Sequence, residues 1–207
     1  PAGERDLTVL QESEEVYGNH KAEEFRKVCD LFGIRDARLL PFVDFPWKVT
    51  EEMIQAVTEL ILEVRPDVVL THAPRLDSSH GWVTYSRQES HGDIGAIAGE
   101  AMGYAATPHV ESGRQAHTVT AVFYLGVDFP LNDIDLFVDI SDQAENRIKA
   151  EMLFATQDHT PEFANKRINI GAGCMGWMAG TSYAEGWVRS GPALARRLDL
   201  TDEELES

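Results

Sequence analysis

The positions of apolar residues alternate along the chain between the spacing of amphipathic helices and that of short strands. Helical spacing predicts helices, whereas short continuous apolar runs bounded by turn residues predict buried strands. The predicted helices cover residues 21–32, 50–64, 94–105 and 141–155, and a further one begins at Thr160. The predicted strands cover residues 6–10, 37–40, 68–71, 118–125 and 136–140. This succession indicates an α/β fold with three layers, a mostly parallel, Rossmann-like sheet with helices on both faces.

Local signals mark several predicted helix ends. Gly33 follows the first helix in the position that a C-cap glycine prefers. Thr50 and Ser141 precede their helices as N-caps, and Thr160 is followed by Pro161 at the first helical position. These signals support the helix assignments independently of the apolar spacing.

The glycine-rich stretch at residues 171–180 indicates either close packing or a loop near a functional site. The aromatic residues Trp177 and Tyr183 are expected to pack against other residues.

Composition narrows the class of protein. A chain of 207 residues with 43% hydrophobic residues is consistent with one domain over residues 1–207. A net charge of -17 argues against nucleic acid or an anionic membrane as partner. The two cysteines are too few for a disulfide framework or a thiolate metal site. With neither a membrane-spanning apolar run nor a signal peptide in the sequence, we expect a cytoplasmic protein.

The residue that stands out chemically is His91, between the predicted strand at 68–71 and the helix that follows. Open α/β sheets bind ligands at the carboxyl ends of their strands, where metal-dependent hydrolases often place a ligand. The alternative is a hydrogen-bonded structural histidine. His72 and His80 are expected to flank such a site without binding metal, and a satisfied polar role at the strand end is an equal alternative.

Several motifs resemble the LmbE/PIG-L family of zinc-dependent de-N-acetylases, which remove acetyl groups from N-acetylglucosamine conjugates and related molecules. Residues 66–72 read Pro-Asp-Val-Val-Leu-Thr-His, and His91, Gly95 and the pair Glu100–Ala101 follow at family-like spacing. Further similar pieces are Lys21-x-x-Glu24, residues 31–34, residues 138–141, Thr156–Gln157 and residues 183–185.

The resemblance implies a Zn²⁺ site in which His91 is one of three protein ligands and a water occupies an open position. Where the family has His-Pro-Asp-His, this sequence has Gln88-Glu89-Ser90-His91. Gln88 therefore stands at the position of the histidine that stabilises the oxyanion, and we predict Gln88 and Glu89 as catalytic residues. A rival alignment starts the motif at His91 and loses the ligand to Ile94, and it does not keep Gly95 in step.

Two further positions are predicted to bind substrate. Lys21 stands where family members often carry an arginine that contacts anionic substrates, and its ammonium group offers a point charge in place of the two-pronged guanidinium. The alternative, an exposed lysine at the start of the helix, is the favoured interpretation of this residue. Asp44 matches a position that contacts sugar hydroxyls, although an aspartate in a turn before Pro46 needs no such role.

The family's first motif, Ala-His-Pro-Asp-Asp, has no match in this sequence. In the family this motif supplies two metal ligands and the general base. We therefore expect that the first strand and helix of the fold lie upstream of Pro1, and that residues 1–207 alone do not hydrolyse a substrate.

The predicted function is zinc-dependent hydrolysis of an acetyl or related acyl group from an N-acetylated sugar or sugar conjugate. The alternative, suggested by Gln88 and Ser90, is a family member that has lost catalysis and binds a sugar-like ligand or a protein. The expected partner is a small molecule. The sequence leaves the exact substrate and the oligomeric state open, a homo-oligomer included.

Overall fold

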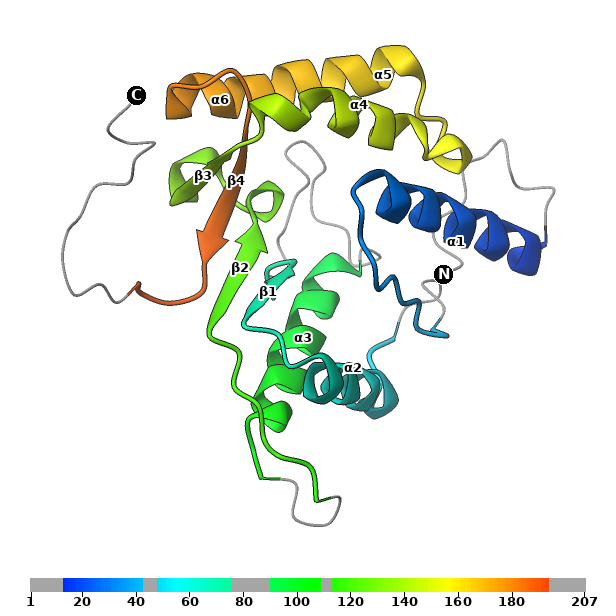
Figure 1. Ribbon diagram of the computed structural model, residues 1–207, viewed down its shortest axis with the longest axis vertical. Helices are drawn as coiled ribbons and strands as arrows, with labels where there is room; N and C mark the ends of the chain where they lie inside the picture. The colour runs from blue at the N-terminus through cyan, green and yellow to red at the C-terminus, as the bar shows by residue number, and fades with distance from the viewer. Residues whose placement is uncertain (1–12, 43–47, 76–89, 109–112, 194–207) are drawn as a thin grey trace. The chain divides into compact units, whose positions relative to one another are not determined.

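The structure, a computed structural model, describes residues 13–42, 48–75, 90–108 and 113–193 (Figure 1). The chain divides into two compact units. Unit 1 comprises Pro1–Trp47 and Asp139–Glu185, and unit 2 comprises Lys48–Val138 and Gly186–Ser207. The single domain over residues 1–207 therefore stays a prediction.

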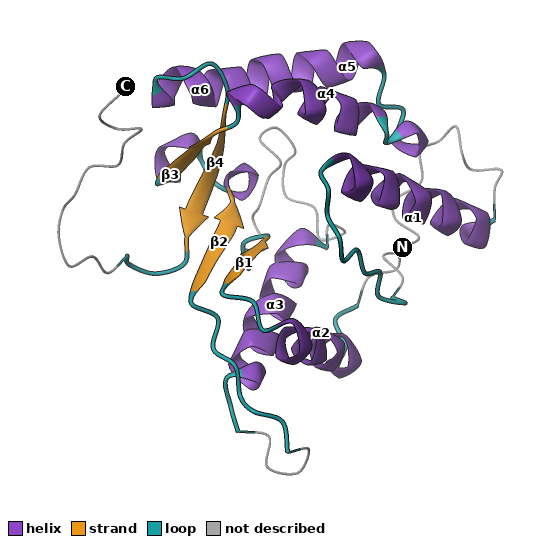
Figure 2. Ribbon diagram, viewed as in Figure 1, coloured by secondary structure: helices purple, strands orange, loops and turns teal. Residues whose placement is uncertain are grey.

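The described residues form one four-stranded sheet in the order β1-β2-β4-β3 (Figure 2). Its strands are β1 (Val68–Thr71), β2 (Ala121–Leu125), β3 (Leu136–Asp139) and β4 (Ala184–Arg189). β1 and β2 are parallel, with Val68 opposite Ala121, whereas β4 runs antiparallel to β2, with Phe123 opposite Arg189. The α/β class predicted from the sequence is confirmed.

Two helices of unit 2 pack against each other next to the parallel pair of strands. They are α2 (Glu51–Val64) and α3 (His91–Ala105). Thr50 caps α2 as predicted, because its hydroxyl accepts a hydrogen bond from the backbone N–H of Met53. Ile61 and Leu62 of α2 and Ala101 and Ala105 of α3 form a buried cluster. The small side chains on α3 let the two helices approach closely.

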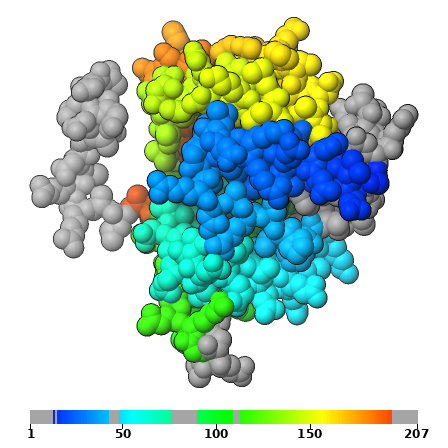
Figure 3. Space-filling view, turned by 45° about the vertical axis from the view of Figure 1, so that its right-hand side comes forward, coloured from blue at the N-terminus to red at the C-terminus, as the bar shows by residue number. Residues whose placement is uncertain are grey.

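Unit 1 consists mainly of helices. They are α1 (Glu14–Leu31), α4 (Ala144–Met152), α5 (Pro161–Lys166), the π-helical segment η5 (Arg167–Ala172) and α6 (Gly173–Ala179). Unit 1 also contains the short 3-10 helices η3 (Ser141–Gln143) and η4 (Ala155–Gln157). Two further 3-10 helices, η1 (Gly126–Asp128) and η2 (Leu131–Asp133), belong to unit 2. In the space-filling view the blue residues of α1 lie against the yellow segment that contains η4 (Figure 3).

Buried carboxylates connect the helices of unit 1. Glu24 of α1 accepts hydrogen bonds from the backbone N–H and the hydroxyl of Thr156, at 2.8 and 2.7 Å. Glu151 of α4 lies 3.2 Å from His159 and 3.3 Å from Arg167. Each of the two carboxylates therefore has the partners that a charge needs when it is removed from water.

Most helix signals in the sequence are confirmed. Gly33 follows α1 in the left-handed region at φ 67°, and Thr160 caps α5 with Pro161 at the helix start. At Gly176 a Cβ atom would lie 2.6 Å from the backbone of Ser182, so close packing is the reason for glycine there. Among the described residues, no helix combines the length and apolar character that crossing a membrane requires.

Five expectations about the fold are wrong. The first helix begins at Glu14 and not at Lys21. Residues 37–40 form no strand, since no described strand pairs with them. β1 was expected to be buried, yet Val68 and Leu70 are 50% and 59% exposed. The reason is that β1 is an edge strand of the described sheet, and only the face opposite these two side chains is packed. Trp177 is 86% exposed on α6. Ser141 does not cap the following helix, which begins at Ala144 after a 3-10 turn.

Ser141 instead belongs to a hydrogen-bonded group around Asp139 at the end of β3. The backbone N–H and hydroxyl of Ser141 donate to one carboxylate oxygen at 2.8 and 2.6 Å, and the Thr181 hydroxyl donates to the other at 2.6 Å. The Ser141 hydroxyl, followed by that of Thr181, holds the pKa of the Asp139 carboxyl below its usual value. This group ties the end of β3 to the loop before β4.

Replacing Asp139 by alanine is expected to lower the free energy of unfolding by about 1 kcal/mol at neutral pH, a small value because solvent screens this exposed carboxylate. A lowered folded-state pKa gives stability that is present above the unfolded value of about 3.9 and is lost as the pH falls through the folded value. Urea unfolding of wild type and Asp139→Ala between about pH 7 and pH 3 measures this difference. The exposed Asp133→Ala serves as control, and a wild-type advantage that persists or grows in acid would contradict the assignment.

Candidate active site

The loop that follows β1 passes directly over the first turn of α3. His72 is the first residue after β1, and His91 is the first residue of α3. Asp128 ends η1, which follows β2, the parallel neighbour of β1. The carboxyl ends of parallel strands lie at the same edge of a sheet, where open α/β folds bind ligands. His72, His91 and Asp128 therefore meet at this edge.

Two glycines of α3 make this close approach sterically possible. A Cβ atom on Gly95 would clash with the carbonyl oxygen of His72 and lie 2.6 Å from the carbonyl carbon of Ala73. A Cβ atom on Gly92 would lie 2.8 Å from the carbonyl carbon of Arg75. Real Cβ atoms do not approach backbone so closely, so both positions require glycine. The spacing between His91 and Gly95 in the sequence thus has a structural cause.

Asp128 holds the loop after β1 through its carboxylate. It is 4% exposed, and its Oδ2 atom accepts a hydrogen bond of 2.7 Å from the backbone N–H of Ala73. Nδ1 of His72 lies 3.1 Å from the same oxygen and 3.2 Å from Oδ1. A buried carboxylate with these partners is not left as an isolated charge.

The imidazole rings of His72 and His91 are stacked. Their centroids are 4.3 Å apart and their planes differ by 7°. A metal ion bound to an imidazole nitrogen lies close to the plane of that ring, and two stacked parallel planes do not meet near the rings. In this arrangement one ion therefore cannot bind both histidines, and at most one of the two is its ligand.

The described residues offer part of a metal site. Among them, no group of three or more His, Cys, Asp or Glu side chains is placed to hold a metal ion. His91 provides one imidazole at a helix start beside a strand end, which fits the role of a single ligand. The zinc ion itself stays a prediction.

Of the other predicted site residues, Gln88, Glu89 and Asp44 lie outside the described residues. Lys21 belongs to unit 1 and lies inside α1, which begins at Glu14, so the interpretation as an exposed lysine at a helix start is wrong. Its Nζ atom lies 3.6 Å from a carboxylate oxygen of Glu24 and 5.4 Å from the centroid of the Phe154 ring, and its side chain is 16% exposed. The predicted contact of Lys21 with substrate stays a prediction.

Asp128 is a site residue that sequence reasoning missed. The signal was available, because an aspartate three residues beyond the predicted strand at 118–125 follows a parallel strand in the same way as His72. Nothing in the sequence, however, showed that β2 lies next to β1 or that the carboxylate turns inward.

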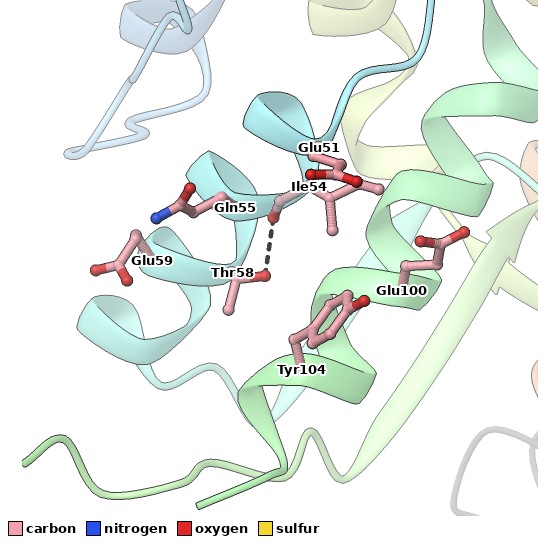
Figure 4. A pocket seen from close by; sticks show the side chains of 7 residues that line it. All are labelled: Glu51, Ile54, Gln55, Thr58, Glu59, Glu100 and Tyr104. Atoms are coloured by element: carbon pink, nitrogen blue, oxygen red, sulfur yellow. Dashed lines mark hydrogen bonds between the residues drawn. The ribbon is translucent and has the colours of Figure 1, made fainter. Parts of the chain in front are cut away.

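A separate cavity of about 420 Å³ lies between α2 and α3 (Figure 4). Its lining residues are Glu51, Ile54, Gln55, Thr58, Glu59, Glu100 and Tyr104. The Thr58 hydroxyl donates to the Ile54 carbonyl, and Glu59 forms an ion pair with Arg114. The lining contains no histidine, so the edge at His91 is the stronger candidate for metal-assisted chemistry.

Comparison with known proteins agrees with the motifs. Residues 2–93 match the PIG-L family, described as GlcNAc-PI de-N-acetylase. A curated relative, the diacetylchitobiose deacetylase of Thermococcus kodakarensis, is 27% identical over 183 residues, which are 83% of this chain. The match covers 64% of that relative, less than two thirds of its length. The resemblance to LmbE/PIG-L deacetylases that the sequence predicted is thereby confirmed.

Solved structures share the fold at low sequence identity. GalB, the 4-carboxy-2-hydroxymuconate hydratase of Pseudomonas putida, matches with a TM-score of 0.73 and 17% identity, over 91% of this chain and 78% of its own. The N,N'-diacetylchitobiose deacetylase of Pyrococcus horikoshii, complexed with its inhibitor MPG, matches with a TM-score of 0.70 and 18% identity, over 91% and 68%. A hydratase and a deacetylase on similar folds show that the fold alone does not set the reaction.

Gly95→Ala is expected to destabilise the protein by more than about 2 kcal/mol, because the added methyl group must push the His72 loop away from α3. The matched control is Gly99→Ala, one turn further along α3, where a Cβ atom meets nothing within 4 Å. Gly99→Ala should be neutral or stabilise by up to about 1 kcal/mol through helix propensity. Thermal and urea unfolding of both variants measure the difference, and equal effects would contradict the close approach.

Proposed function

We propose that this protein is a metal-dependent hydrolase that removes an acetyl or related acyl group from an N-acetylated sugar or sugar conjugate. The observation that carries the proposal is the position of His91, at the start of α3 beside the carboxyl ends of β1 and β2. The match to a family described as GlcNAc-PI de-N-acetylase and the relative named as a diacetylchitobiose deacetylase support it.

Hydrolysis of an acetamide at neutral pH needs a strong nucleophile, a proton acceptor and a group that stabilises the oxyanion. A bound zinc ion supplies the first by lowering the pKa of a water molecule towards about 7. His91 would hold this ion through its imidazole. The side-chain amide of Gln88 would be a donor for the oxyanion, a contribution of roughly 3 kcal/mol when well placed, and the adjacent Glu89 is a second catalytic candidate.

Substrate recognition in this proposal rests on Lys21 and Asp44. An ammonium group suits an anionic part of a conjugate, and a carboxylate accepts hydrogen bonds from sugar hydroxyls. Lys21 already contacts Glu24 and Phe154, so binding an anion there requires the ammonium group to share or exchange these contacts. The particular N-acetylated sugar remains a proposal. Assembly into a homo-oligomer and a cytoplasmic location are separate points, and each of them remains a proposal too.

A second candidate is a protein that binds an N-acetylated sugar without hydrolysing it. The observation in its favour is the replacement of two family positions, by Gln88 and Ser90. A glutamine donates a hydrogen bond but does not transfer a proton as histidine does, so catalysis through this position is weakened while binding is retained.

The central test is the zinc content of the full-length protein, together with acetate release from N-acetylglucosamine derivatives and diacetylchitobiose. Wild type is expected to hold zinc and release acetate. His91→Ala should lose the zinc and reduce acetate release at least about 100-fold, because the variant lacks an imidazole ligand. The exposed His20→Ala is the matched control and should keep both properties.

The outcomes separate the two candidates. Metal-free wild type that releases no acetate but binds the sugar in calorimetry would replace the hydrolase by the binding protein. Zinc retained in His91→Ala, with wild-type affinity, would show that His91 is not a ligand.

A further inference from the structure

The contacts of Asp128 determine which nitrogen of His72 carries a proton. Oδ2 of Asp128 accepts from the Ala73 N–H, so this oxygen acts as a carboxylate acceptor. The same oxygen lies 3.1 Å from Nδ1 of His72, and an acceptor needs a donor there. Nδ1 therefore carries hydrogen in the neutral ring, and the lone pair of His72 is on Nε2.

The stacked ring of His72 in turn restricts the orientation of the His91 ring. A flat ring 4.3 Å away and inclined by only 7° covers one face of the His91 imidazole. Rotation of His91 about its Cβ–Cγ bond would drive the ring edge into His72. The backbone on both sides is fixed as well, since Gly95 lies directly against the His72 carbonyl.

We propose that Asp128 is a positioning residue that acts on His91 through His72. Its carboxylate fixes the orientation and the tautomer of His72, and the fixed ring sets the orientation in which His91 faces the reaction site. The orientation of His72 and His91 follows from the contacts of Asp128, whereas the consequence of this orientation for catalysis rests on the proposed hydrolase function.

A purely structural role for Asp128 would be satisfied by its bond to the Ala73 N–H alone. The carboxylate also lies against Nδ1 of His72 and thereby defines the tautomer of that ring, which a structural role does not require. A structural role predicts loss of stability when Asp128 is changed, whereas a positioning role predicts a change in His72 and His91 while the fold is retained.

The variant that separates these roles is Asp128→Asn, which keeps the size and shape of the side chain. Its amide oxygen, in the place of Oδ2, still accepts from the Ala73 N–H and stays near Nδ1 of His72, whereas its NH₂ group replaces Oδ1, the second acceptor 3.2 Å from that nitrogen, with a donor. The expected result is a weaker preference for hydrogen on Nδ1, seen as a larger share of the His72 tautomer with hydrogen on Nε2. The matched control is Asp133→Asn, an exposed aspartate in η2.

Long-range ¹H–¹⁵N correlation spectra of the full-length protein with ¹⁵N-labelled histidine measure the tautomer directly. Wild type and Asp133→Asn should show His72 with hydrogen on Nδ1, and Asp128→Asn should show a larger share of hydrogen on Nε2, with shifted His91 ring signals. Zinc titration should show affinity lowered about 10–100-fold in Asp128→Asn, the range for groups that orient a metal ligand. In the acetate assay kcat should fall by a similar factor while KM is unchanged.

A wild-type spectrum with hydrogen on Nε2 of His72 would overturn the proposal without any variant, so it stays testable if Asp128→Asn fails to fold. A changed share of the two His72 tautomers that leaves the His91 signals and zinc affinity unchanged would also overturn it, because His91 would then not depend on Asp128. Wild type that releases no acetate sinks the hydrolase function instead, and the tautomer and zinc measurements still decide the role of Asp128.

Discussion

The candidate site depends on one steric constraint, the contact of the loop after β1 with the first turn of α3. Backbone atoms of His72 and Ala73 occupy the space that a side chain on Gly95 would fill, and Arg75 does the same at Gly92. Interiors are packed too densely to absorb an added methyl group at such a contact. The constraint brings His72 and His91 together although many residues separate them in the chain.

Electrostatic interactions of Asp128 then hold the loop after β1 in this position. The buried carboxylate of Asp128 takes one bond from the backbone and faces a ring nitrogen of His72, so the same group anchors the loop and orients its histidine. Metal-binding histidines in proteins are commonly oriented by a neighbouring group, and the oriented ring of His72 stacks on the ring of His91. Asp128 comes from the end of the neighbouring parallel strand, which explains why the site forms at this edge of the sheet.

The fold leaves the reaction open, and particular residues narrow it. Structures with TM-scores of 0.73 and 0.70 include a hydratase as well as a deacetylase. A bound metal that activates water suits both kinds of chemistry, so the groups around it decide which bond reacts. In the proposed function those groups would be His91, Gln88 and Glu89, and this proposal rests on their residue types and not on the fold.

Local chemistry in the sequence determined much of the secondary structure. The Thr50 and Thr160 caps and Gly33 after α1 follow from short-range hydrogen bonding and backbone geometry, which the sequence encodes directly. The strand at 68–71 follows from its short apolar run. At Ser141 the prediction was wrong because a long-range contact decided the outcome. Ser141 could have capped a helix, but its hydroxyl binds Asp139 and Thr181, which is distant in sequence.

The site shows the same division. The sequence determined that a histidine stands at a helix start after a strand, with glycine four residues on, because motif spacing is a property of the chain. Only the tertiary structure decided that Asp128 joins His72, that His72 stacks on His91, and that Gly95 is required by a backbone contact. These depend on which strands become neighbours, and strand order is set by packing of the whole sheet, which no local pattern records.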